Sequence, residues 1–237
     1  MKHLIFSILV LLSIFSIHSQ SYIGHAVDNY SGIHSVVFNP ANIVDSPFKA
    51  DINISSFSAF GGSDYFGINV SDIIESDTAF DFDDDTFTSP SNSNNFFLNT
   101  DYVGPSFMFN LSKKSSIGII TRVRGILNVN NINGQLYENL INDFDEDEDF
   151  SFDNPNLTTS LHAWGEIGLS YGRILLSKQK HMLSGGVTLK YLVGAGTAFA
   201  STPGFLGQFD ATNETLQSQG LINYGSSQDF NSDDISF

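Results

Sequence analysis

The chain has 237 residues, 41% of them hydrophobic, and a net charge of −16 from 26 acidic and 10 basic residues. The acidic excess argues against nucleic acid as a partner, because phosphates require Lys and Arg. Cysteine is absent, which excludes disulfides, thiol catalysis, cysteine-ligated metal and a lipid anchor on an N-terminal cysteine.

The first 19 residues have the organisation of a secretory signal peptide. Lys2 gives a basic start, an apolar run follows from Leu4 to Ile17, and Ser19 is a small residue suited to cleavage. A membrane anchor is the alternative, but the run is short for a bilayer. We therefore predict export, with a signal peptide over 1–19, an irregular segment over 20–48 and a β-domain over 49–237.

The first strand is predicted over residues 49–71. Asn39 and Pro40 favour a turn ahead of it, because Pro fixes φ and Asn can hydrogen-bond its own backbone. The apolar positions change parity near Ser55 and again near Gly61, which predicts two bulges in one long strand; a tight hairpin at Gly61–Asp64 is the alternative.

A hairpin with an apolar face and a polar face is predicted over 103–129, after an acidic polar segment over 72–99. The chain turns at Lys113–Ser115. Alternating side chains point to opposite faces of a strand. The predicted apolar face comprises Val103, Pro105, Phe107, Phe109, Leu111, Ile117, Ile119, Val123, Leu127 and Val129.

The clearest hairpin runs from Leu161 to Gly194, with a polar turn over 177–180. Its arms of about 14 residues exceed the five or six of an ordinary strand. A polar loop is predicted over 130–160 before it. Beyond Gly196 we predict a polar tail with at most a weak strand near Leu221–Tyr224.

The connections differ in length and charge. The two turns within hairpins, at Lys113–Lys114 and Lys178–Lys180, are short and basic, whereas the connections between hairpins are long and acidic. Outer-membrane barrels show this contrast, while a soluble sandwich, the alternative, has turns of comparable length. The sequence therefore predicts an all-β, antiparallel transmembrane β-barrel in the cell outer membrane, with lipid as its partner.

Several motifs support a family resemblance. They are Gln20–Tyr22, Asp28–Gly32, Phe38–Asn42, Asp51–Asn53, Gly104–Phe109, Thr121–Arg124, Trp164–Arg173, Lys180–His181 and Gly186–Tyr191. As a set they resemble an uncharacterised family of Bacteroidota outer-membrane barrels, a domain of unknown function. The resemblance covers most of residues 20–200 and implies a porin-like, non-enzymatic barrel. Some members of that family carry an OmpA-like peptidoglycan-binding domain after the barrel.

A second resemblance rests on Asn39–Pro40–Ala41 alone. This element is similar to the start of FadL-like fatty-acid transporters and of PorV-like barrels of type IX secretion. It implies transport of hydrophobic or small molecules, or a role among secretion-machinery proteins, as alternatives to a structural role.

The strand count falls short of a closed barrel. Five strands are clear and a sixth is weaker, whereas a bacterial barrel needs at least eight. We therefore expect an N-terminal portion of a longer protein. A small barrel with poorly patterned last strands, or a sheet closed by oligomerisation, is the alternative.

Four charged residues lie on the polar faces of the predicted strands: Arg122, Arg124, Glu166 and Lys190. An Arg or Lys facing lipid at mid-depth costs about 2–4 kcal/mol, so we expect these side chains in the lumen. A salt-bridge network that supports the wall is the simpler interpretation. The alternative is a ligand or ion pathway, in which Arg side chains hold a carboxylate through two hydrogen bonds.

No motif indicates catalysis, a cofactor or a metal. Asp143, Asp145 and Asp147 alternate in an acidic loop, but the Gly and distal Glu of a calcium-binding loop are missing. We expect a solvated loop there, with a weak divalent-ion site as the alternative. The predicted function is a non-enzymatic structural barrel, able to tether to peptidoglycan through a further C-terminal domain.

Overall fold

A computed structural model describes residues 30–44, 46–69, 81, 85–142, 144, 148–178 and 181–227. The predicted signal peptide and Asp143, Asp145 and Asp147 lie outside these ranges. Within them the chain is all-β with a large antiparallel sheet, which confirms the predicted fold class at that level.

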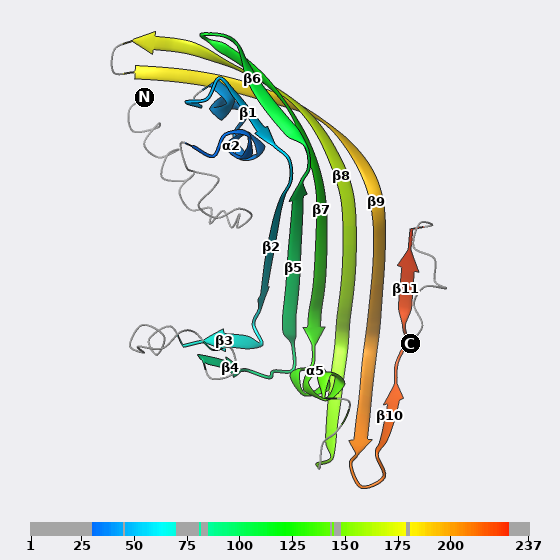
Figure 1. Cartoon of the computed structure of the whole chain (residues 1–237). Coiled ribbons are helices and arrows are strands. Elements are labelled where there is room, and N and C mark those ends of the chain that lie inside the picture. Colours follow the sequence, from blue (N-terminus) through cyan, green and yellow to red (C-terminus); the bar gives the residue numbers. More distant parts are fainter. Residues whose placement is uncertain are drawn as a thin grey trace, which may run out of the picture.

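Nine strands form the large sheet, and a separate pair, β3 and β4, forms a second one (Figure 1). The strands of the large sheet are β1 (Ala50–Asn53), β2 (Ser56–Ser63), β5 (Asn94–Val103), β6 (Ser106–Ser112), β7 (Ser115–Ile132), β8 (Phe150–Lys178), β9 (His181–Asp210), β10 (Thr215–Gln219) and β11 (Asn223–Ser226). The small pair is β3 (Phe66–Ile68) and β4 (Thr86–Thr88).

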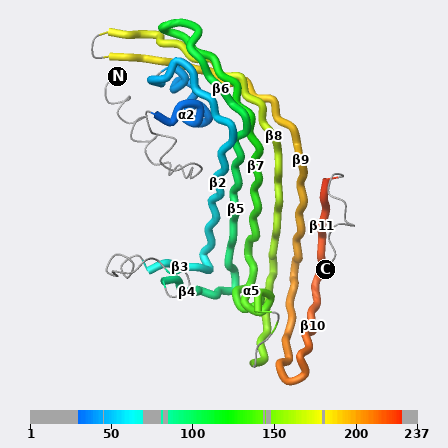
Figure 2. The backbone as a smooth tube through the Cα atoms, in the orientation of Figure 1, coloured from blue at the N-terminus to red at the C-terminus, as the bar shows by residue number. Residues whose placement is uncertain are grey.

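Three pairs of strands lie end to end, so the nine strands make six ribbons. Strands β1 and β2 lie along β6 and β5, which in turn lie along β7, while β10 and β11 lie along β9. The order is therefore β1/β2, β5/β6, β7, β8, β9, β10/β11, as the backbone trace shows (Figure 2). Within the described residues neither outer ribbon pairs with the other, so the sheet is open.

The central hairpin is about twice as long as its sequence pattern indicates. Strands β8 and β9 have 29 and 30 residues, paired from Phe150↔Phe209 to Lys178↔His181. The predicted polar loop over 130–160 is therefore wrong for most of its length. The polar tail beyond Gly196 is wrong too, except that the weak strand predicted near Leu221–Tyr224 overlaps β11. These stretches are rich in Ser, Thr, Asn and Gly, so they lack hydrophobic alternation although their backbone groups pair along the sheet. A helix, α5 (Gly134–Ile141), precedes β8.

The prediction for residues 49–71 is partly confirmed. Strands β1 and β2 form one ribbon, and the exposed apolar side chains change from Ile52 and Ile54 to Phe57. The second expected bulge is wrong, because β2 pairs regularly with β5 as far as Ser63↔Phe96, and the chain then leaves for β3. The alternative hairpin at Gly61–Asp64 is also wrong, because β3 pairs with β4.

The predicted polar segment over 72–99 is wrong at its end, because β5 begins at Asn94. Its face assignment changes too. Five residues from Val103 to Phe107 lie against four from Arg122 to Ile119, so the ribbon bulges at Gly104–Pro105. Val103 is consequently buried on the face opposite the exposed Phe107, and not beside it as the alternation predicts.

Part of the segment over 20–48 is helical. The chain forms α2 (Ile33–Phe38) and a 3₁₀ helix, η1 (Pro40–Val44), on the concave side of the curved sheet (Figure 1). The turn predicted at Asn39–Pro40 lies between them. Asp51 on β1 accepts the Ile33 N–H at 2.7 Å and so satisfies one free donor of the helix start.

The hydrophobic core lies between this helical segment and the concave face. Its buried members are Ile33, Val36, Ile43, Val103, Met108 and Ile120. Glycines allow the close approach: a Cβ on Gly172 would lie 2.4 Å from Ile43, and one on Gly186 would lie 2.4 Å from the Pro40 backbone. The helical segment therefore packs directly against strand backbone at positions where any residue larger than glycine would clash.

Candidate functional site

The charged residues predicted from the sequence come together on the concave face. The strand register places Arg122 opposite Glu166 and Arg124 opposite Trp164, and it places Asp101 of β5 opposite Arg124. Lys190 of β9 lies two residues from Leu192, the residue that pairs with Glu166. Asp101, Arg122, Arg124, Glu166 and Lys190, from four neighbouring ribbons, form what we call the ion-pair network.

Asp101 and Arg122 form the buried half of the ion-pair network. The Arg122 Nε donates to Asp101 Oδ1 at 2.7 Å, and its Nη2 contacts Oδ2. The side chains are 3% and 7% exposed. Such a two-point contact fixes both groups and compensates the buried charges. Asp101 was not among the residues predicted for the polar face, because the alternation from Val103 to Leu111 assigns its parity to the apolar face and the bulge at Gly104–Pro105 reverses that assignment.

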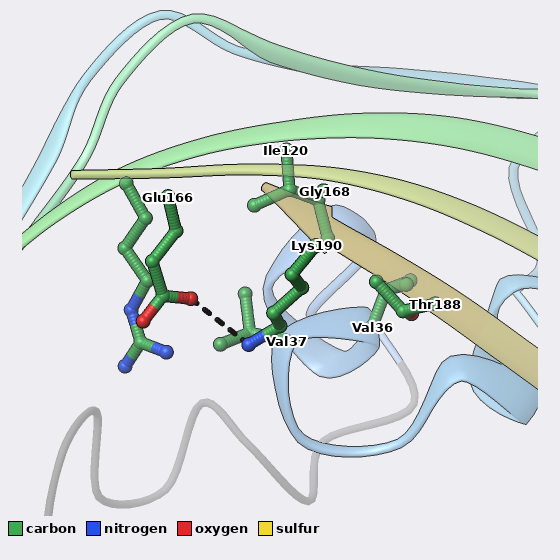
Figure 3. Close-up of a pocket in the computed structure, with 8 residues that line it drawn as sticks. Val36, Val37, Ile120, Glu166, Gly168, Thr188 and Lys190 are labelled. Carbon is green, nitrogen blue, oxygen red and sulfur yellow. Dashed lines mark hydrogen bonds and ion pairs between the residues drawn. The ribbon is translucent and has the colours of Figure 1, made fainter. Parts of the chain in front are cut away.

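Glu166 occupies the centre of the ion-pair network. Its Oε2 accepts from Lys190 Nζ at 2.9 Å and its Oε1 accepts from Trp164 Nε1 at 2.9 Å. Figure 3 shows the Glu166–Lys190 contact below Ile120, with Val36 and Val37 of α2 nearby. Glu166 is 7% exposed and Lys190 is 42% exposed, so the Glu166 side chain is covered while the Lys190 side chain is partly open to its surroundings.

Arg124 belongs to the ion-pair network but is held loosely. Its Nε lies 4.0 Å from Asp101 Oδ2 and its Nη1 lies 4.0 Å from Glu166 Oε1, distances beyond a hydrogen bond. Its guanidinium lies 5.1 Å from the centroid of the Trp164 ring. A cation at this distance over an aromatic face is attracted to it.

The site offers electrostatic binding. Three cations face two carboxylates. The described residues contain no group of three or more His, Asp or Glu side chains placed to hold a metal ion. What the arrangement can do chemically is to hold charge at fixed positions beside an indole ring.

A second polar cluster lies at the far end of the sheet, beside α5. The Tyr65 hydroxyl donates to Glu138 Oε1 at 2.6 Å, and the Tyr65 ring contacts Phe66, Phe96 and Tyr137. Burial and the Glu138 carboxylate raise the pKa of Tyr65 well above its ordinary value. This cluster joins the β3–β4 pair to α5 and so has a structural role.

Fold and site together define a class: an all-β protein whose open antiparallel sheet carries an ion-pair network on a concave face partly covered by an N-terminal helical segment. None of the helices among the described residues is long and apolar enough to cross a membrane.

The chain belongs to a family of unknown function, DUF5723, whose sequence model matches residues 40–236. The predicted resemblance to an uncharacterised family is confirmed at this level. No curated protein and no solved structure gives a significant match to the chain.

Proposed function

We propose that this sheet is part of the wall of an outer-membrane β-barrel, with a structural and non-enzymatic role. The observation that carries the proposal is the exposure of the apolar face. One line of paired residues crosses five ribbons on the convex face: Ile52, Phe107, Ile119, Leu169 and Leu189. All of them except Ile119 are exposed, and Leu189 is 71% exposed.

The apolar face continues along the strands. On β8 the outward positions from Leu161 to Tyr171 are Leu161, Ala163, Gly165, Ile167, Leu169 and Tyr171. A tilted strand of about 9–11 residues crosses a bilayer, so this stretch has the height of a membrane wall. A soluble protein rarely exposes an apolar surface of this extent.

The open edges also favour this setting. In lipid every backbone donor and acceptor needs a protein partner, so a sheet can cross a membrane only as a closed barrel. We infer that further strands cover the outer edges of the β1/β2 and β10/β11 ribbons, together with the part of β9 that β10 and β11 leave unpaired. The α2–η1 segment occupies the concave face, which favours a wall or plugged barrel over an open channel.

The test uses the absence of native cysteine. Leu189→Cys on the convex face and Lys190→Cys on the concave face, each labelled with an environment-sensitive dye, form a matched pair of adjacent residues. In vesicles of outer-membrane lipids with doxyl-labelled acyl chains, we expect quenching of the dye at position 189 and little at position 190. Equal quenching at both positions, or none at 189, would overturn the proposal.

Two further measurements separate the roles. Heat-modifiable migration on a denaturing gel is expected for a closed barrel. Vesicle flux of ions, sugars and fatty acids is expected to stay at the protein-free level. Flux above that level would favour a transporter, and co-purification with secretion-machinery proteins would favour a secretion component. Binding to peptidoglycan sacculi would support the tethering role.

A further inference from the structure

We propose that Arg124, with Lys190 and the Trp164 ring beside it, binds a small organic carboxylate on the concave face. The inference goes beyond the structural role, and its test does not depend on a membrane setting. It begins with charge: the ion-pair network has three cations and two carboxylates, so it keeps one positive charge in a chain of net charge −16.

Arg124 is the cation whose Nε has no hydrogen-bond partner among the described residues. Arg122 is bound to Asp101 at two points, and Lys190 donates to Glu166. The Nε of Arg124 is shielded from solvent without a hydrogen-bond partner, and neither carboxylate approaches its guanidinium closer than 4.0 Å. A shielded donor without a partner destabilises the protein, so a shift of the side chain that brings this donor to a ligand oxygen contributes to affinity.

The surroundings of Arg124 are open and apolar on the side away from α2. The side chain is 31% exposed, and Leu192, on the same face of β9, is exposed as well. A Cβ on Gly194, which pairs with Trp164, would meet no atom within 4 Å. The planar guanidinium offers paired donors that match a carboxylate, and the ring and Leu192 suit a short apolar chain. These features favour an organic acid over an inorganic anion.

The experiment uses Trp164, the single tryptophan of the chain, as a reporter inside the site. The refolded full chain is titrated with sodium butyrate, with the uncharged butan-1-ol and with inorganic phosphate, at constant ionic strength. We expect a saturable change in tryptophan emission with butyrate, none with butanol, and weaker binding of phosphate. Equilibrium dialysis of radiolabelled butyrate gives a second readout, because substitutions near Trp164 change its emission.

The variants are Arg124→Gln, Lys190→Gln and, as the matched control, Arg173→Gln, which removes an exposed cation from β8 away from the site. We expect Arg124→Gln to weaken butyrate binding at least tenfold, Lys190→Gln to weaken it less, and Arg173→Gln to leave it unchanged. If circular dichroism shows that Arg124→Gln does not fold, the comparison of butyrate binding by Lys190→Gln and by Arg173→Gln tests the proposal.

Three outcomes would overturn the assignment: no saturable butyrate binding, equal binding by the Arg124 or Lys190 variant and the Arg173 variant, or an equal response to butanol. Tighter binding of phosphate than of butyrate would also overturn the carboxylate assignment. Each of these leaves the lipid-quenching result at Leu189 untouched, so failure of this inference and of the wall proposal can be told apart.

Discussion

The two faces of the sheet differ although they share the same strands. Glu166 is covered and paired on the concave face, while its neighbour Ile167 is exposed on the convex face. Lys190 and Leu189 show the same alternation. A soluble sheet normally buries its apolar face and exposes its polar one. The concave face is thus stabilised by a few specific contacts between side chains. The stability of the convex face depends instead on whether water or an apolar environment surrounds it.

The largest expected effect comes from breaking the buried half of the ion-pair network. Arg122→Ala leaves the Asp101 carboxylate buried without its partner, which costs about 3–5 kcal/mol in the free energy of unfolding. Chemical unfolding of the refolded chain measures it. Arg173→Ala, an exposed site, is expected to change stability by less than about 0.5 kcal/mol. Adding Asp101→Asn to Arg122→Ala should recover part of the loss; similar losses for Arg122→Ala and Arg173→Ala would contradict this account.

The convex face is expected to respond only in lipid. Leu169→Arg should destabilise the vesicle-bound protein by about 2–4 kcal/mol, because an Arg at mid-depth loses its hydration. Ser151→Arg, an exposed position near the far end of the same strand, is the matched control and should cost much less. Denaturant unfolding from vesicles gives both values. An equal loss of unfolding free energy for Leu169→Arg and Ser151→Arg would show that position 169 faces water and not lipid.

Much of the sheet follows from sequence because alternation is a direct consequence of strand geometry. The hairpins around Lys113 and Lys178, and the opposite faces of Arg122 and Val123, were predictable in this way. The first part of β8, over 150–160, and the last part of β9, over 197–210, could not be predicted in this way. Their Ser, Thr and Gly residues pair through backbone groups and leave no apolar alternation in the sequence.

The ion-pair network shows the same division. Its four members on β7, β8 and β9 were recognised by their place on a polar face. Asp101 was not, because a one-residue bulge changes which parity faces inward, and neither Gly104 nor Pro105 fixes that change by itself. The contact of η1 with Gly172 and Gly186 was also missed, since sequence alone does not tell which glycines face another segment.

That contact gives a third, smaller prediction on the concave face. Gly172→Val would place side-chain atoms within η1, and we expect a loss of about 1–3 kcal/mol through overpacking. Gly194→Val is the matched control, because its Cβ would meet open space. Unfolding free energies of the two variants test the docking of η1. Stability that is equally reduced in both would show that the cost comes from the backbone and not from the contact.

The smallest effect concerns Asp64, which directly follows β2. Burial raises the pKa of Asp64, but hydrogen bonds from the Asn95 backbone and side chain, and from Asn94, outweigh it and lower the pKa below the ordinary value. The stability supplied by Asp64 is therefore fully present above the unfolded pKa of about 3.9, and is lost as pH falls through the lower folded pKa.

Asp64→Asn should accordingly flatten the acid side of the stability–pH profile, measured by denaturant unfolding between about pH 5 and pH 2. Asn95→Ala removes the side-chain donor and keeps the backbone donor, so its profile should lie between those of the wild type and Asp64→Asn. If Asn95→Ala matched the wild type, the Asn95 backbone N–H and the Asn94 side chain would suffice to hold the carboxylate. If Asp64→Asn kept the full acid dependence, the contacts at this end of the sheet would contribute nothing to stability in acid.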